Sequence, residues 1–283
     1  MRTNLVLARV GANSLHAEWL DSGSTRNWDL RLVPYQPIPY RDGVDCKVGE
    51  VIPGPKWSGI RQVLNQWDGW RAYDRIWIPD DDILAKQDVI NRMFDVADAL
   101  NLDLFAPALD EASYYAHYSA MRNSSFYGRW VGFVEIMAPG FDRVALEQLL
   151  PTLDLTETGW GWGLDSVWPK VLGYKNVGII DATPVTHTRP VGQMRDADLR
   201  RRIVEESDKL LERYDCVQMH ATFGAFGEDL RPLELSPECL LVEVVKGWQY
   251  LVERDPRVLS WIVDFHRHRF APPEYPIEGT PAV

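Results

Sequence analysis

Residues 75–83 read Arg75-Ile-Trp-Ile-Pro-Asp-Asp-Asp-Ile83. The apolar residues before Pro79 predict a short buried strand, and the proline ends it because it has no amide hydrogen to give to a sheet. Asp80, Asp81 and Asp82 follow at once. The stretch therefore predicts a strand whose carboxyl end opens onto three carboxylates, at the edge where open α/β sheets usually bind ligands.

Strand and helix patterns alternate on both sides of this stretch. Strands are predicted at residues 5–10, 28–33, 75–78, 104–107, 130–137 and 177–181. Helices are predicted at residues 15–20, 56–66, 83–100, 141–150, 165–172, 196–214 and 240–253. Residues 35–55 show little periodicity and are expected to form a loop. The order of elements up to about residue 110 favours a parallel sheet of the nucleotide-binding type.

The composition is that of a folded, acidic protein. The chain has 283 residues, 46% of them hydrophobic and 25% charged, so it can bury a sizeable core. Its net charge of −11 disfavours nucleic acid as a partner, because an acidic surface repels a phosphate backbone. Cys46, Cys216 and Cys239 form no CxxC pair, which argues against a disulfide framework or a zinc site.

Nothing in the sequence predicts export or a membrane span. The apolar run at residues 5–10 is interrupted by Arg9 and is too short for a signal peptide. No apolar stretch approaches the roughly 18 residues that cross a bilayer. A cytoplasmic protein is therefore expected.

The three aspartates have a functional and a structural interpretation. On an extended chain alternate side chains point the same way, so Asp80 and Asp82 would share one ligand while Asp81 points elsewhere. Crowded carboxylates repel each other unless a cation lies between them, and Mg²⁺ or Mn²⁺ prefers oxygen ligands. Alternatively, aspartates at the start of the helix predicted from residue 83 would interact with its dipole. One aspartate would suffice for that role, so a metal site is favoured.

A glycine-rich aromatic loop, Gly159-Trp-Gly-Trp-Gly163, precedes Asp165. Glycines such as Gly163 let the backbone approach a ligand, and the rings of Trp160 and Trp162 offer flat faces to a sugar. Asp165 is either the cap of the following helix or a general base that deprotonates a hydroxyl group. The sequence leaves these two roles of Asp165 open.

Four further charged or titratable side chains are weaker candidates. His187 would complete the metal site if its strand ends beside Asp82. Lys56 and Arg189 could contact a diphosphate, although surface solvation is common for such residues. Glu135 interrupts an apolar strand pattern, and a buried carboxylate needs partners. No GxSxG, Walker-type, GxGxxG or HExxH motif is present.

Four motifs, in this order and spacing, resemble a family shared by plants and bacteria that is filed as a domain of unknown function and looks like a type-A glycosyltransferase. The resemblance covers about residues 56–195 and rests on Tyr73-Asp-Arg-Ile-Trp-Ile-Pro-Asp-Asp-Asp-Ile83, Gly132-Phe-Val-Glu-Ile-Met-Ala-Pro-Gly-Phe-Asp-Arg143, Gly161-Trp-Gly-Leu-Asp165, and Gly178-Ile-Ile-Asp-Ala182 with His187. It implies an α/β fold with a Rossmann-like nucleotide half, at about residues 1–110, on a mixed central sheet. An acceptor half would span residues 111–195, and residues 196–283 would form a mainly helical extension.

The resemblance also implies roles for single residues. Asp80 and Asp82 match the two aspartates of an Asp-x-Asp metal motif, and His187 matches a late histidine that completes the metal site. Asp81 would reach the ribose or a neighbouring base. Asp165 matches the catalytic base of inverting members. The turn that begins at Val10 and Gly11 would face the nucleotide base.

The sequence thus predicts a metal-dependent glycosyltransferase. It would use Mn²⁺ or Mg²⁺ to bind a UDP- or GDP-sugar and would transfer the sugar to a carbohydrate or another hydroxyl acceptor. Two alternatives belong to other classes. A metal-dependent phosphoesterase or nucleotidyltransferase would need a second metal and more ligands, and a carbohydrate-binding protein without catalysis would depend on the tryptophans alone.

Overall fold

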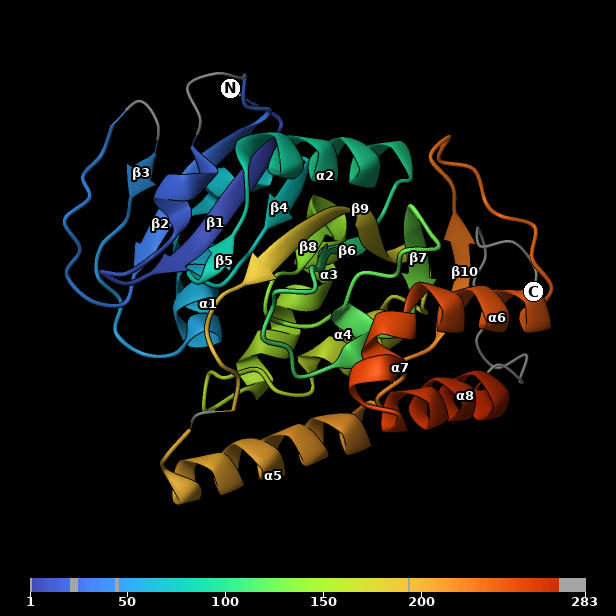
Figure 1. The fold of residues 1–283 in the computed structure, drawn as a ribbon. Coiled ribbons are helices and arrows are strands. Elements are labelled where there is room, and N and C mark those ends of the chain that lie inside the picture. The colour runs from blue at the N-terminus through green and yellow to red at the C-terminus, as the bar shows by residue number, and fades with distance from the viewer. Residues whose placement is uncertain (1, 21–24, 44–45, 193, 270–283) are drawn as a thin grey trace.

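The computed structural model describes residues 2–20, 25–43, 46–192 and 194–269, and in it one central sheet runs through the molecule (Figure 1). Its strands follow the order β10-β7-β9-β6-β8-β4-β1-β2-β3, and β5 pairs with β9 beside it. The strands are β1 Asn4–Val10, β2 Trp28–Pro34, β3 Lys47–Val48, β4 Arg75–Trp77, β5 Ile83–Leu84, β6 Leu104–Leu109, β7 Gly128–Val131, β8 Gly140–Asp142, β9 Val177–His187 and β10 Thr222–Phe226.

The sheet is mixed. β1 is parallel to β2 and β4, β2 is parallel to β3, and β6 is parallel to β9. β8 lies between β4 and β6 and runs antiparallel to both, and β7 runs antiparallel to β9 and β10. The first strands thus pair in parallel, as the sequence predicts, and the α/β fold with a mixed central sheet is confirmed.

Helices cover both faces of this sheet. The α-helices are α1 Lys56–Gln66, α2 Gln87–Ala99, α3 Arg143–Leu149, α4 Leu164–Val171, α5 Ala197–Arg213, α6 Pro237–Gly247, α7 Gln249–Arg254 and α8 Arg257–Arg269. Short 3-10 helices span His16–Trp19, Asp68–Ala72, Tyr118–Ala120 and Leu150–Leu155. None of the helices in the described ranges combines the length and the hydropathy that a membrane crossing requires.

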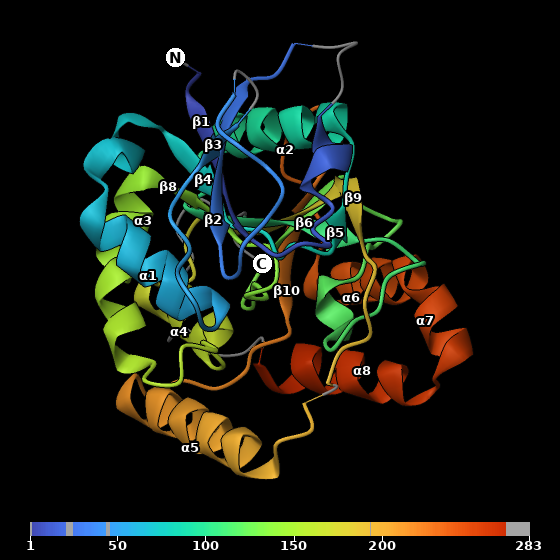
Figure 2. The ribbon, with the colours of Figure 1, turned by 90° about the vertical axis from the view of Figure 1, so that its left-hand side faces the viewer.

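Two hydrophobic cores lie on the two faces of the sheet. In β1 the alternating residues Val6 and Ala8 join one core, and Leu5 and Leu7 join the other, because successive side chains of a strand point to opposite faces. The first core includes side chains of α2 and of α6–α8, and the second includes side chains of α1, α3, α4 and α5. Figure 2 shows these two groups of helices on opposite sides of the strands.

Four predicted elements have different bounds in the structure. The helix predicted at 83–100 begins at Gln87, because residues 83–84 form β5 and pair with β9. The strand predicted at 130–137 is wrong beyond Val131, where a loop begins. The helix predicted at 141–150 begins at Arg143, after β8, and ends at Leu149. The strand predicted at 177–181 continues to His187.

The C-terminal part of the chain, residues 196–269 of the described structure, is mainly helical but also contributes to the central sheet. The single helix predicted at 240–253 is two helices, α6 and α7, which meet at Trp248. The sequence prediction missed α8 and β10. β10 pairs with β7, so the predicted extension supplies the strand at one end of the sheet.

A buried ion pair joins the middle of the sheet to this C-terminal part. Arg129 in β7 donates to both carboxylate oxygens of Asp181 in β9, at 2.8 and 3.0 Å, and both side chains are fully buried. The backbone amide of Asn123 donates to the same carboxylate at 2.7 Å. The Arg129 guanidinium also lies 4.7 Å from the ring centre of Trp248. One charged pair therefore holds two strands, a loop and a C-terminal tryptophan together.

The glycines of the loop at residues 159–163 are needed for packing. Gly159, Gly161 and Gly163 have φ angles of 72°, 77° and 94°, a region that residues with a side chain rarely adopt. A Cβ at Gly161 would lie 2.4 Å from Trp57 in α1, and one at Gly163 would lie 3.0 Å from Ser207 in α5. These glycines let the loop contact helices, whereas the sequence suggested that they let it approach a ligand.

We expect Gly161→Ala to destabilise the protein by about 2–4 kcal/mol, because the left-handed backbone and the overlap with Trp57 each add a cost. Gly173→Ala is the matched control: its φ is 65°, but nothing lies within 4 Å of the added Cβ. The control should therefore lose only about 1–2 kcal/mol. Urea denaturation of both variants measures the difference, and equal losses would show that the contact with Trp57 does not matter.

Candidate active site

The aspartates lie in a tight turn after β4. The strand ends at Trp77, and Asp81 and Asp82 form a turn that leads into β5. The extended geometry assumed for Asp80 and Asp82 is therefore wrong. The helix-dipole alternative is also wrong, because α2 begins only at Gln87 and is preceded by Lys86. The three carboxylates face different partners as a result.

Asp80 is paired with Lys56 at the start of α1. The Lys56 ammonium lies 2.7 Å from Asp80 Oδ1 and donates to the carbonyl oxygens of Ile136 and Met137, at 2.8 Å each. All three hydrogens of the ammonium group are thereby used. Lys56, which the sequence suggested as a diphosphate contact, instead holds the turn against the loop at residues 132–139.

Asp81 ties three segments of the sheet edge together. Its Oδ2 accepts from the backbone amide of Gly11 at 2.8 Å and from the hydroxyl of Tyr35 at 3.0 Å. Its Oδ1 accepts from Arg189 at 3.0 Å, and Arg189 also donates to the carbonyl of Asn13 at 2.7 Å. The predicted ribose contact of Asp81 stays a prediction, but in the structure protein donors occupy both of its oxygens.

Asp82 and His187 form a buried pair, as the sequence suggested they could. β5 and β9 bring them together, because Ile83 lies opposite His187 in their antiparallel pairing. His187 Nε2 lies 3.2 Å from Asp82 Oδ2, and His187 Nδ1 lies 2.8 Å from the carbonyl oxygen of Tyr114. Asp82 Oδ1 is buried, and no described residue donates a hydrogen bond to it.

The electrostatics of this pair follow from burial and mutual contact. Burial alone would raise the pKa of Asp82, but the hydrogen bond from His187 and the charges of His187 and Arg189 outweigh it and lower that pKa. Burial would lower the pKa of His187, but the hydrogen bond to Asp82 and its charge outweigh it and raise that pKa. Each partner therefore favours the charged form of the other.

These residues fit a divalent cation. Both contacts of the His187 ring are oxygen acceptors, so Nδ1 carries a hydrogen for Tyr114 and Nε2 needs a positive partner, either a proton or a metal, between it and Asp82. The unpartnered Oδ1 of Asp82 adds a second ligand. Within the described ranges no group of three His, Cys, Asp or Glu side chains is arranged to hold a metal. Asp82 and His187 could therefore supply two ligands, and the other ligands of a cation would have to come from outside this pair.

Asp165 is a buried carboxyl group at the start of α4. It is 6% exposed, and its Oδ1 accepts from the hydroxyl of Ser166 at 3.1 Å. The cap position of α4 is Gly163, so Asp165 is not the helix cap. Burial raises the pKa of Asp165 to about 7, although the hydrogen bonds of Ser166 act in the opposite direction. A carboxyl group that titrates near neutral pH suits a general base.

Glu135 lies between the two sets of residues. It follows β7 in the loop at residues 132–139, and the adjacent Val134 amide donates to the carbonyl oxygen of Asp165 at 3.2 Å. Burial is the main cause that raises the pKa of Glu135 to about 8, and the charge of Asp165 acts in the same direction. The charges of His187, Asp80 and Lys56 act on it as well. Glu135 is therefore close to both the aspartate turn and the candidate base.

The remaining predicted residues are buried to different degrees. Val10 is fully buried, and its carbonyl oxygen accepts from the amide of Tyr35 at 3.1 Å. A Cβ at Gly11 would overlap the Tyr35 hydroxyl. Trp160 is 38% exposed, and Trp162 is partly buried. Their stacking on a sugar stays a prediction.

Sequence reasoning missed Tyr35 and Tyr114. Tyr35 comes two residues after the strand predicted at 28–33, so its place at the sheet edge could have been inferred from the parallel arrangement of the strands. Tyr114 acts through its backbone carbonyl oxygen, and a backbone contact leaves no signal in the residue type.

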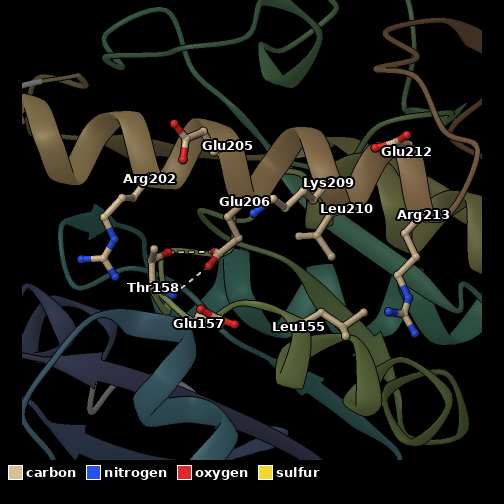
Figure 3. A pocket seen from close by; sticks show the side chains of 10 residues that line it. All are labelled: Leu155, Glu157, Thr158, Arg202, Glu205, Glu206, Lys209, Leu210, Glu212 and Arg213. Atoms are coloured by element: carbon tan, nitrogen blue, oxygen red, sulfur yellow. Dashed lines mark hydrogen bonds between the residues drawn. The ribbon is translucent and has the colours of Figure 1, made fainter.

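A surface pocket of about 450 Å³ lies elsewhere, between α5 and the loop at residues 155–158 (Figure 3). Thr158 donates to Glu206 from its amide at 2.8 Å and from its hydroxyl at 2.7 Å. Acidic and basic side chains alternate along α5, and the lining includes none of the residues around Asp82 or Asp165. Asp82, Glu135 and Asp165 have shifted pKa values and none of them lines this pocket, so the candidate site is placed with them.

No protein-family profile matches the chain, and no curated protein matches it significantly. Among solved structures it is similar to residues 1–349 of S. aureus TarS in complex with UDP-GlcNAc, with 10% identity and a TM-score of 0.49, over 95% of this chain and 89% of that chain. For the complex of the same protein with UDP, the TM-score is 0.46, at 10% identity and the same coverage. Such a likeness assigns no residue of this chain to a role.

Proposed function

We propose that the protein is a metal-dependent glycosyltransferase that moves a sugar from a nucleoside diphosphate to an acceptor hydroxyl. The observation that carries the proposal is the buried Asp82 carboxylate, which has one unpartnered oxygen and has His187 at the other. A cation held there suits the departure of an anionic diphosphate, and a carboxyl group such as Asp165, whose pKa burial raises to about 7, suits the removal of one proton.

Asp82 and His187 would hold the cation, and Asp80 would stay with Lys56. When bound, the cation neutralises the charge that develops on the leaving diphosphate. Asp165 takes the proton of the acceptor hydroxyl as that oxygen bonds to the anomeric carbon of the sugar. The bond from the anomeric carbon to the diphosphate oxygen breaks, and its electron pair leaves with the diphosphate. Attack from the side of a base favours inversion at the anomeric carbon.

Calorimetric titration with UDP and with GDP, each with and without Mn²⁺, tests the cation position. We expect one nucleotide to bind at least tenfold more tightly with Mn²⁺, and EDTA to reverse the gain. Asp82→Asn should abolish the metal dependence, because it removes the charge of the carboxylate that has a buried, unpartnered Oδ1 and contacts His187 through Oδ2. Asp154→Asn, at a side chain that is 65% exposed, is the control and should behave like the unmodified protein.

A panel of UDP- and GDP-sugars with Mn²⁺ then tests the reaction. Release of nucleoside diphosphate that depends on an added hydroxyl acceptor, or slow hydrolysis to water, supports the transferase. Failure to bind or cleave any of these sugars, with or without metal, would contradict it. Hydrolysis of p-nitrophenyl phosphate would favour the phosphoesterase alternative, and metal-independent sugar binding would favour the carbohydrate-binding alternative.

A further inference from the structure

One buried carboxyl oxygen near the candidate base has no partner. Glu135 Oε2 is inaccessible to solvent, and no described residue donates a hydrogen bond to it. An unsatisfied buried polar atom typically costs about 1–3 kcal/mol. A group of this kind in a native protein calls for an explanation, such as a ligand that satisfies it.

The backbone around Glu135 is held firmly. On one side the Val134 amide donates to the backbone carbonyl oxygen of Asp165. On the other side the carbonyl oxygens of Ile136 and Met137 accept from the Lys56 ammonium. Both anchors belong to the proposed reaction centre, one to the base and one to the aspartate turn. These contacts fix the backbone on both sides of Glu135, so its side chain starts from a defined position between them.

The place of Glu135 between the proposed base and the proposed cation indicates which part of the substrate it would contact. In a sugar transfer the diphosphate lies at the cation and the acceptor hydroxyl at the base, so the transferred sugar lies between them. The charges that act on Glu135 come from both ends, from Asp165 and from Asp80, His187 and Lys56. The group that lies between these two ends in the substrate is the hexose, which presents hydroxyl groups.

We propose, resting on the transferase function above, that Glu135 is a specificity-determining residue whose Oε2 forms a hydrogen bond with a hydroxyl group of the transferred sugar. The observation behind it is independent of the cation site, because it concerns the unpartnered oxygen of another side chain in another loop. The hydrogen bond exists with the nucleotide sugar and not with the nucleotide alone.

The test compares two affinities in the full-length protein with Mn²⁺. Calorimetry gives the dissociation constants of UDP-glucose, UDP-GlcNAc and GDP-mannose and of the matching nucleotides. For the sugar nucleotide that binds most tightly, Glu135→Leu should weaken binding at least tenfold and leave the nucleotide within twofold. Glu135→Gln keeps a polar group in place, so it should weaken binding of the sugar nucleotide less than the leucine variant does, by about threefold or more. Glu157→Gln at an exposed position is the matched control.

The outcomes separate this inference from the proposed function. If the unmodified protein binds none of the sugar nucleotides, the transferase function and this inference both fall. If it binds one and both Glu135 variants keep the unmodified ratio of nucleotide to sugar-nucleotide affinity, only this inference falls. Glu135→Gln keeps the test valid if the leucine variant does not fold. A general defect in folding would weaken nucleotide and sugar nucleotide equally.

Discussion

Replacing Asp165 by asparagine should lower the rate of sugar transfer by about 10²–10⁴-fold, because a general base contributes about that factor. Asparagine keeps the shape of the side chain and the acceptor for the Ser166 hydroxyl, but it cannot take a proton. In the unmodified protein, kcat/KM should rise with pH through about 7, where burial places the pKa of Asp165. Initial rates between pH 5.5 and 8.5 with a sugar nucleotide and an acceptor measure both effects.

The same substitution should stabilise the protein. The pKa of Asp165 is about 7 in the folded state and 3.8 for an ordinary aspartate. Between those values the folded state keeps a proton that the unfolded state has released, so stability falls as pH rises from about 4 to 7. The asparagine variant escapes this loss, which amounts to about 2–4 kcal/mol.

The gain in melting temperature should therefore be larger at pH 8 than at pH 4. Asp198→Asn, at a side chain that is 89% exposed, is the control and should change neither activity nor melting temperature. An asparagine variant that keeps its activity would show that Asp165 is not the base. If the gain in melting temperature does not grow with pH, then burial does not raise the pKa of Asp165 in the folded protein.

Asp181→Asn should destabilise the protein by about 3–5 kcal/mol, because it leaves the fully buried guanidinium of Arg129 without a counter-charge. The asparagine oxygen can still accept from the Asn123 amide, so the loss reports mainly on the charge. Urea denaturation, followed by circular dichroism and by tryptophan fluorescence to check two-state behaviour, measures the change.

A double variant separates the charge from the packing. Arg129→Met together with Asp181→Asn removes both charges and keeps the acceptor for Asn123. It should be more stable than Asp181→Asn alone, since removing a buried ion pair is less harmful than leaving half of it. A double variant that is less stable than the single one would mean that the hydrogen bonds of Arg129 to neighbouring carbonyl oxygens dominate instead.

Sequence patterns predicted the elements whose signal is local. The apolar run in β1, the alternation in β2 and the helical patterns in α1 and α5 are visible within single segments, and the structure confirms these elements. β3 and β5 have two residues each, and β8 has three, too few for a period to show. Their existence depends on pairing with strands that are distant in the sequence.

β9 shows why a correct strand was predicted too short. The strand runs past Pro184, although proline cannot donate to a sheet. The strand continues because it changes partners, from β6 and β7 to β5, and prolines are tolerated where pairing is incomplete. That change of partners places His187 beside Asp82, so the most useful feature of the site came from a contact that no local pattern encodes.

The site itself was predictable in its residue types and less so in its contacts. Charge crowding predicted that Asp80 and Asp82 need positive partners. The sequence could not show that Lys56 supplies the partner of Asp80, since the two residues lie in different elements that only the fold brings together. Asp81, which looked the least certain of the three, has the most protein contacts and joins β1, β2 and β9 at their ends.

The two end strands of the sheet have a consequence for self-association. An end strand with free backbone groups is a template onto which a second copy can add, and long, flat end strands promote aggregation. Here β3 offers only two residues, and the pairing of β10 with β7 shifts register between Thr222 and Gly224, which marks a bulge or an irregularity there. A short end and an irregular end are both poor templates, so the broad sheet is protected against growing from molecule to molecule.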